Sequence, residues 1–142
     1  KKSKILIFGN GGSSTIASHF SVDMIKNIGI KCLNFSDAGH ITCFANDYGF
    51  ENWITKTIEL YSNKGDLLFL ISSSGRSKNM LNAAMNSKKY NISSVITLTG
   101  FDNNNPLKKI GDINLWVDSK SYNFIENAHQ LWLLSLIDLL KK

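Results

Sequence analysis

The chain contains few cysteines and no long apolar run. Its 142 residues include two cysteines, Cys32 and Cys43, which are too few for a disulfide framework and lack the spacing of a metal site. We expect both to be reduced thiols in the core. The apolar runs are too short and interrupted to span a membrane, and no signal peptide precedes the first predicted strand. We therefore expect a cytoplasmic protein without a membrane partner.

The sequence also lacks a basic stripe. The formal net charge is +5, but the lysines are scattered, and no basic cluster carries interleaved aromatic residues. This charge is as consistent with a general attraction for small anions as with nucleic-acid binding. We expect no nucleic-acid partner. Only strongly salt-dependent DNA binding would support nucleic-acid binding as a function.

The sequence instead alternates short apolar runs with amphipathic segments. We predict five strands, over residues 5–8, 30–35, 67–71, 94–98 and 113–117. Because these strands are apolar throughout, they predict a parallel sheet covered by helices on both faces. The expected fold class is α/β, a three-layer sandwich in a single domain over residues 1–142. Its expected strand order is the flavodoxin-like 2-1-3-4-5.

Apolar residues at helical spacing predict the helices between the strands. The first helix has a stripe of Ile16, Phe20, Met24 and Ile28, and Gly29 ends it. Asn46, Asp47 and Gly49 punctuate the chain before a helix whose predicted buried face is Phe50, Trp53, Ile54, Thr57, Ile58 and Tyr61. A further helix is predicted from Ser77 to about Tyr90, and its expected buried face consists of Met80, Leu81, Ala84 and Met85. The last helix, over residues 123–140, is apolar enough to be covered on more than one side.

Two of the predicted strands end in similar loops, each of which opens a helix. The first loop is Gly9-Asn10-Gly11-Gly12-Ser13-Ser14, and the second is Ser72-Ser73-Ser74-Gly75-Arg76-Ser77. Glycines let backbone N–H groups approach an anion, helix N-termini present unpaired donors, and serine hydroxyls add more. In the predicted order, the two loops follow the strands between which the order reverses, where ligands bind. They therefore predict one phosphate held between both loops.

Two other glycine-rich motifs fit less well. A dinucleotide fingerprint requires a third glycine after Gly9-Asn10-Gly11, and Ser14 stands there instead, although Asp37 would be available to bind a ribose. A Walker loop requires Gly-Lys-Ser or Gly-Lys-Thr, and neither loop contains the lysine. Nucleoside triphosphate chemistry is therefore not expected.

Several longer strings resemble the SIS (sugar isomerase) domain family, in its phosphoheptose isomerase branch. They are Gly9-Asn10-Gly11-Gly12-Ser13, His19-Phe20, Ser36-Asp37 with His40-Ile41, Asn46-Asp47-Tyr48-Gly49-Phe50, Ile71-Ser72-Ser73-Ser74-Gly75 with Ser77, and Ile96-Thr97-Leu98-Thr99-Gly100. The resemblance runs from the first strand to the last helix. It implies the five-stranded sandwich, a phosphorylated sugar as ligand, and a homo-oligomer, a tetramer or dimer, with sites at subunit interfaces.

The resemblance also implies roles for individual residues. It assigns phosphate contacts to Ser72, Ser73, Ser74 and Ser77. It places Asn10, Gly11, Gly12 and Ser13 against the sugar, and Asn46 and Asp47 at its hydroxyls. From the residues alone, the serines are equally an ordinary helix cap, and Asn46-Asp47 is more simply a turn.

The expected catalytic positions depart from the family pattern. His19 and Asp23 lie four residues apart, hence on one helix face, where the family has His and a Glu that acts as base. Glu126 stands where the family has a glutamine, and Leu134 replaces a histidine that acts as acid. His129 is a further catalytic candidate, or simply a buried histidine. His19, Asp23 and Glu126 form a candidate site for a divalent metal such as zinc.

These features support two hypotheses of different classes. The first is an aldose–ketose isomerase acting on sedoheptulose 7-phosphate or a related sugar phosphate, which uses Asp23 as base. The second is a non-catalytic SIS module that binds a phosphosugar for regulation or protein interaction, for which Leu134 is the strongest argument. Exchange of the carbon-bound proton of the substrate with solvent distinguishes the two.

Overall fold

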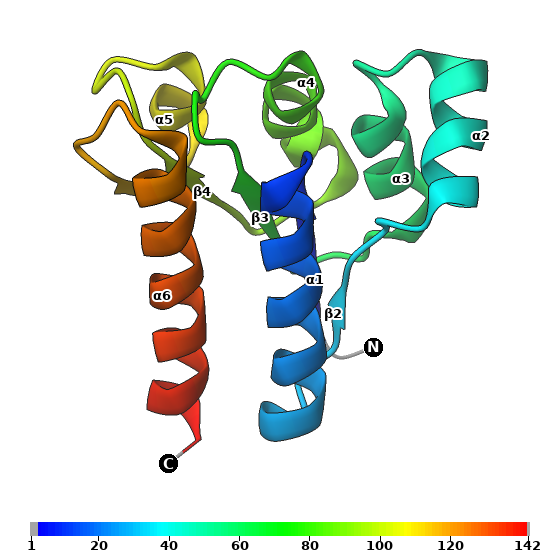
Figure 1. Cartoon of the computed structure of the whole chain (residues 1–142). Coiled ribbons are helices and arrows are strands. Elements are labelled where there is room, and N and C mark those ends of the chain that lie inside the picture. Colours follow the sequence, from blue (N-terminus) through cyan, green and yellow to red (C-terminus); the bar gives the residue numbers. More distant parts are fainter. Residues whose placement is uncertain (1–2, 142) are drawn as a thin grey trace.

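The computed structural model describes residues 3–141. It contains one parallel sheet with helices packed against it (Figure 1). The strands are β1 (Ile5–Gly9), β2 (Cys32–Leu33), β3 (Leu67–Ile71), β4 (Ser94–Thr99) and β5 (Ile113–Trp116). All neighbouring strands pair in parallel, in the order β2-β1-β3-β4-β5. The predicted fold class and strand order are confirmed.

Helices cover both faces of the sheet. They are α1 (Gly12–Asp23), α2 (Ala38–Tyr48), α3 (Trp53–Tyr61), α4 (Lys78–Asn86), α5 (Pro106–Ile110) and α6 (Tyr122–Leu140), with a π-helical turn η1 (Met24–Ile28) after α1 and a 3₁₀ turn η2 (Ser87–Tyr90) after α4. Helices α1 and α6 lie side by side on one face (Figure 1). Helices α3, α4 and α5 pack on the other face, and α2 packs on α3.

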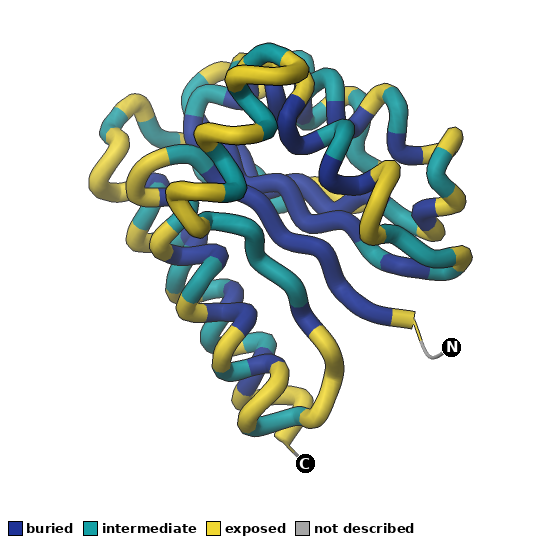
Figure 2. The backbone as a smooth tube through the Cα atoms, turned by 90° about the vertical axis from the view of Figure 1, so that its right-hand side faces the viewer, coloured by how far each residue is buried: buried dark blue, intermediate teal, exposed yellow. Residues whose placement is uncertain are grey.

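The sheet separates two buried clusters because successive strand residues point to opposite faces. In β1, Ile5 and Ile7 pack with α1 and α6, whereas Leu6 and Phe8 pack with α3 and α4. The strands in the centre of Figure 2 are accordingly buried along most of their length. A sheet covered on both faces accounts for the apolar character of its strands.

The first helix ends as the sequence indicates. Its apolar residues recur every four positions, which is slightly more than the 3.6 residues of an α-helical turn. After Asp23 the helix widens into the π-helical turn η1, and this wider turn keeps Ile28 in line with the others against the core. Gly29 then adopts a left-handed conformation with φ of 76°, which only glycine adopts without strain.

Some sequence predictions are wrong. Helix α2 was not expected, because Asn46, Asp47 and Gly49 were interpreted as a break in the chain, although Ile41 and Phe44 of this helix pack against the core. Asp37 caps it by accepting a hydrogen bond from the backbone N–H of His40 at 3.1 Å. Asn46 and Asp47 consequently lie in its last turn, and Gly49 ends it. Strand β2 is also shorter than predicted, since it pairs with β1 alone over two positions.

Four side chains that were expected in the core are exposed. Phe50 precedes the start of α3, and Tyr61 ends it, so neither continues the buried face of that helix. Met85 lies beside the stripe of Met80 and Ala84 and points to solvent. Cys43 lies on the exposed surface of α2. Cys32, in contrast, is a free buried thiol as predicted, and burial raises its pKa to about 12.

Only one face of α6 is covered within the chain. Ile125, Leu133 and Ile137 are buried, whereas Phe124, Leu131 and Leu139 are exposed. No helix among residues 3–141 combines the length and apolarity that crossing a bilayer requires.

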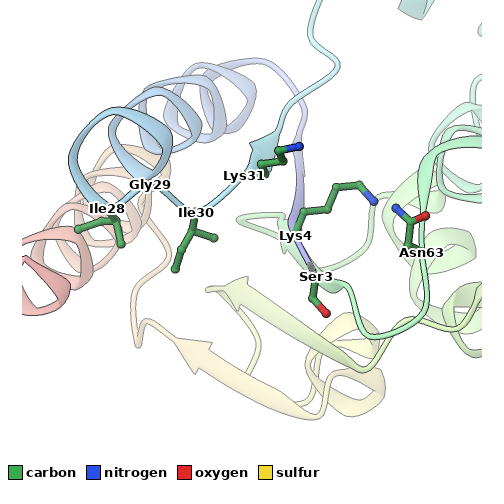
Figure 3. A pocket seen from close by; sticks show the side chains of 7 residues that line it. All are labelled: Ser3, Lys4, Ile28, Gly29, Ile30, Lys31 and Asn63. Atoms are coloured by element: carbon green, nitrogen blue, oxygen red, sulfur yellow. The ribbon is translucent and has the colours of Figure 1, made fainter. Parts of the chain in front are cut away.

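A buried ion pair closes the amino-terminal edge of the sheet. Asp66 accepts hydrogen bonds from the Lys4 ammonium, from the Lys4 backbone N–H at 2.9 Å and from the Asn63 backbone N–H at 2.7 Å. A cavity of about 630 Å³ lies beside the pair, between Lys4, Asn63 and the residues that precede β2 (Figure 3). The Lys4 ammonium is already occupied by Asp66, so this cavity offers no free buried charge to a ligand.

We expect Asp66→Asn to lower the free energy of unfolding by about 3 kcal/mol, because it leaves the Lys4 charge buried without a partner. Burial alone raises the pKa of Asp66, but the hydrogen bonds from Lys4 and Asn63 outweigh it and the pKa lies below its ordinary value. The stabilisation is therefore present at neutral pH and lost as the pH falls through the folded-state pKa. Urea unfolding at pH 7 measures the loss.

The control for this variant is Asp138→Asn, on the exposed surface of α6, which should change stability by about 0.5 kcal/mol or less. Equal effects of the two substitutions would contradict a stabilising role for the Lys4–Asp66 pair.

Candidate functional site

The loop after β3 combines a tight backbone turn with inward serines. The Gly75 backbone N–H donates to the Ser72 carbonyl at 2.9 Å, and Gly75 has φ of 63°. A side chain at Gly75 would also collide with buried Asn105, whose Oδ1 lies 2.0 Å from the ideal Cβ position. Glycine is therefore required there for both conformation and space. Ser77 follows as the residue that precedes α4.

The serine hydroxyls of this loop are poorly satisfied by the protein itself. The Ser72 hydroxyl donates to the Ser77 hydroxyl at 3.2 Å, and Ser74 accepts from the Arg76 backbone N–H at 3.2 Å. Ser73 is buried, yet its hydroxyl has no hydrogen-bond partner among residues 3–141. Such a group is costly to bury, so an unpaired buried hydroxyl in a loop that lines a cavity indicates a site for a polar ligand.

The loop after β1 meets the serine loop at the same edge of the sheet. Gly11 has φ of 53°, and α1 begins at Gly12. The N-terminal ends of α1, α4 and α6 all lie at this edge (Figure 1). Both loops line one cavity of about 140 Å³, whose walls are Asn10, Ser13, Ile71, Ser72, Ser73, Ser74, Ser77, Tyr122 and Glu126.

The third wall of this cavity comes from α6. The Glu126 carboxylate lies over Gly12, since a Cβ added at Gly12 would be 2.6 Å from Glu126 Oε2. Gly12 thus makes room for this side chain. Glu126 is the one carboxylate among the residues that line the cavity.

Arg76 lies outside the cavity wall. Its guanidinium is exposed and forms an ion pair of 3.0 Å with Asp102, in the loop that precedes α5. The Leu107 backbone N–H donates to the Gly75 carbonyl at 3.1 Å. These contacts hold the serine loop against the loop after β4.

Other predicted substrate-binding residues lie apart from the cavity. Gly11 borders a neighbouring surface hollow with Ser14, Thr15, Ser18 and Ser36. Asn46 and Asp47 are exposed at the end of α2, where the Asn46 amide donates to the Asp47 carboxylate at 2.9 Å. Within one chain the structure does not bring Asn46 and Asp47 to the serine loop.

His19 and Asp23 form a pair on α1, with His19 Nε2 3.4 Å from Asp23 Oδ2. Gly12, His19 and Asp23 fall on one side of the helix, the side on which Gly12 meets Glu126. At a helical rise of 1.5 Å per residue, Asp23 lies about 16 Å along α1 from Gly12, and His19 about 10 Å. The pair therefore lies about two to three helical turns along α1 from the cavity.

The expected metal ligands His19, Asp23 and Glu126 do not come together within one chain. No group of three or more His, Cys, Asp or Glu side chains between residues 3 and 141 has an arrangement suited to a metal ion. The pair on α1 and Glu126 at the cavity are too far apart to share one.

His129 lies in the protein interior instead of the cavity. It is fully buried on α6, and its Nε2 lies 3.1 Å from the Thr99 carbonyl oxygen. Burial lowers the pKa of His129, and the Thr99 hydrogen bond only partly offsets this. Nδ1 has no partner among the described residues. Leu134, further along α6, is half-buried.

Sequence reasoning missed two residues near the cavity. Tyr122 lines its wall from the first residue of α6, and Asn79 pairs with Asn10 from behind it. Tyr122 was foreseeable, because it opens a helix at the edge where the two loops end. Asn79 carried no signal in the sequence, since its partner is 69 positions away.

Comparison with known proteins identifies the family. The SIS domain family matches residues 1–100. A phosphoheptose isomerase of Fusobacterium nucleatum is 34% identical over 97% of this chain and 73% of its own length. One of Helicobacter pylori is also 34% identical, over 98% of this chain and 74% of its own.

Solved structures agree with the sequence comparison. A phosphoheptose isomerase from Francisella tularensis superposes with a TM-score of 0.88 at 31% identity, over 97% of this chain and 75% of that one. One from Neisseria gonorrhoeae gives a TM-score of 0.86 at 32% identity, over 97% and 76%. The chain therefore belongs to the SIS domain family, in its phosphoheptose isomerase branch.

We expect His129 to make the protein less stable in mild acid. Its folded-state pKa is lowered by burial, so below about pH 6.5 the unfolded chain takes up a proton that the folded chain does not. Stability therefore falls as the pH decreases from 7 to 5, by up to about 1.4 kcal/mol per pH unit. Urea unfolding across this range measures the slope, which His129→Gln should reduce. Equal slopes for both proteins would contradict this assignment.

Proposed function

We propose that this chain is an aldose–ketose isomerase that acts on sedoheptulose 7-phosphate or a related sugar phosphate. The observation that carries the proposal is the cavity between the loops that precede α1 and α4. The unpaired hydroxyl of Ser73 and the carboxylate of Glu126 lie in its wall. The relatives named phosphoheptose isomerase support the same activity. Hydroxyl and backbone N–H donors at a helix start suit a phosphate group.

The reaction requires proton transfer between two adjacent carbons. A base removes the proton from the carbon beside the carbonyl while the carbonyl oxygen gains one, which gives an enediol. A proton then returns to the former carbonyl carbon. The hydroxyl on the neighbouring carbon, from which the base took the first proton, loses its own proton as the new carbonyl forms there. No net proton or electron is consumed. Carboxylates positioned at the reacting carbons can carry out both transfers.

We assign the serine loop to the phosphate and Asp23 to the base. In a sugar 7-phosphate, the reacting carbons lie at the opposite end from the phosphate. The pair of His19 and Asp23 lies on the cavity side of α1 but well below the loops, in the direction of the ligand's end remote from the phosphate. Glu126, in the cavity wall beside the loops, is assigned to binding sugar hydroxyls.

Substitutions at Asp23 test the catalytic part of this proposal. Asp23→Asn removes the base, so we expect kcat to fall by about 10²-fold or more. Asp23→Glu restores the longer side chain of the family, so we expect kcat to rise by about tenfold because positioning improves. Both variants should bind the sugar phosphate as the wild type does. Exchange of the carbon-bound proton with deuterium from solvent, followed by NMR, reports the chemical step.

Saturable binding of sedoheptulose 7-phosphate by the folded wild type, with neither turnover nor proton exchange, would overturn the isomerase and leave the non-catalytic binding module. Glu51→Gln, which changes an exposed carboxylate in the turn before α3 on the other face of the sheet, is the matched control.

We further propose that the chain works as a homo-oligomer, a tetramer or dimer. Val22 on α1 and Phe124, Leu131 and Leu139 on α6 are all more than half exposed. A further apolar hollow of about 420 Å³ runs between α6 and β5, beside Trp132 and Leu136. Apolar surface of this extent is typical of an interface.

We expect Leu131→Glu combined with Leu139→Glu to lower the molecular mass in solution to that of one chain, because both charges would be buried in the interface. Analytical ultracentrifugation measures the mass. Lys109→Glu, on α5 across the sheet, is the charge control and should leave the assembly intact. An unchanged mass for the double variant, or a wild type that is already monomeric, would contradict the proposal.

A further inference from the structure

A reciprocal amide pair joins the two loops of the cavity from behind. Asn79, in the first turn of α4, donates through Nδ2 to Asn10 Oδ1 at 2.9 Å, and Asn10 donates through Nδ2 to Asn79 Oδ1 at 3.1 Å. Asn79 is 1% exposed and does not line the cavity, whereas Asn10 does. The pair therefore links a buried residue behind the serine loop to a wall residue of the first loop.

The backbone fixes which way this pair faces. The Met80 backbone N–H donates to Asn79 Oδ1 at 3.0 Å. A backbone N–H can only donate, so this atom of Asn79 must be the amide oxygen. The Asn79 nitrogen must then face Asn10, and the Asn10 oxygen must face back toward it. One N–H of the Asn10 amide remains free of the pair, so Asn10 is held as a hydrogen-bond donor.

We propose that Asn79 is a positioning residue of the phosphate site, which holds Asn10 in the orientation that donates a hydrogen bond to the bound ligand and fixes the first loop against the serine loop. This inference rests on the proposed phosphate site but not on the isomerase reaction. An Asn10 amide turned the other way would present its oxygen to an anion and repel it. Because Asn79 is buried, water cannot easily replace its two hydrogen bonds.

A double-mutant cycle with inorganic phosphate tests the proposal. We expect Asn79→Ala to raise the Kd for phosphate about tenfold in the otherwise wild-type chain, since Asn10 is then free to turn. In the Asn10→Ala background the same substitution should raise Kd by about twofold or less, because the residue through which it acts is gone. A merely structural role would give the same change in both backgrounds. Calorimetry supplies each Kd, and thermal unfolding checks that each variant is folded.

Asn82→Ala is the matched control, because Asn82 is one turn further along α4 and its amide donates to the Glu51 carbonyl at 3.0 Å, away from the cavity. It should leave the Kd unchanged. If Asn79→Ala does not fold, Asn79→Leu replaces it in the cycle. Its side chain is of similar size and uncharged, and it loses both hydrogen bonds to Asn10.

The outcomes separate this inference from the proposed function. In the isomerase assay, Asn79→Ala should raise KM with little change in kcat, since it acts on binding. Equal losses of phosphate affinity in the two backgrounds, or none in the wild-type background, would overturn the role of Asn79. Phosphate binding with the expected cycle but without turnover would overturn the isomerase and leave Asn79 as a positioning residue. A wild type that binds no phosphate would overturn both.

Discussion

The direct pairing of β1 with β3 is the constraint on which the candidate site depends. Gly9 at the end of β1 stands opposite Ile71 at the end of β3, so the residues that follow them, Asn10 and Ser72, emerge side by side. Successive strands are added to one side of β1 up to β2 and to the other side from β3 onward. The helices that follow β1 and β3 therefore lie on opposite faces of the sheet, and the space between the two loops stays open. Neither loop alone encloses an anion, and the sheet register makes them one cavity.

The structure places the residues proposed to bind an anion apart from those proposed to move a proton. The cavity is assembled within one chain, with buried serines and a fixed Asn10 amide. The groups proposed for proton transfer are arranged more loosely, since His19 is half-exposed and Asp23 lies several turns along α1. His129, which the sequence offered as an alternative, is held in the interior against Thr99. Completion of the reactive end of the site therefore fits an assembly in which a neighbouring copy covers α1 and α6.

The sequence predicted what depends on local pattern. Apolar runs identified the strands, their alternation with helices led to the flavodoxin-like order, and glycines between a strand and a helix identified both loops. It did not reveal α2, because Asn46, Asp47 and Gly49 indicate a turn, and the apolar face of this helix is only half-buried. It could not distinguish Glu126 from His129, three residues apart on α6, because the packing of that helix decides which faces the cavity and which faces Thr99. Asn79 was beyond reach for a similar reason, since its role depends on a contact between distant loops.

One NMR titration tests the central claim most directly. Backbone amide signals of Gly11 and Gly12 in the first loop, and of Ser73 and Gly75 in the second, are followed as inorganic phosphate is added. If one phosphate is held between both loops, all four signals shift with a single shared Kd, while those of Lys4 and Asn63 at the opposite edge of the sheet stay in place. Shifts confined to one loop, or different Kd values for the two loops, would contradict a shared site.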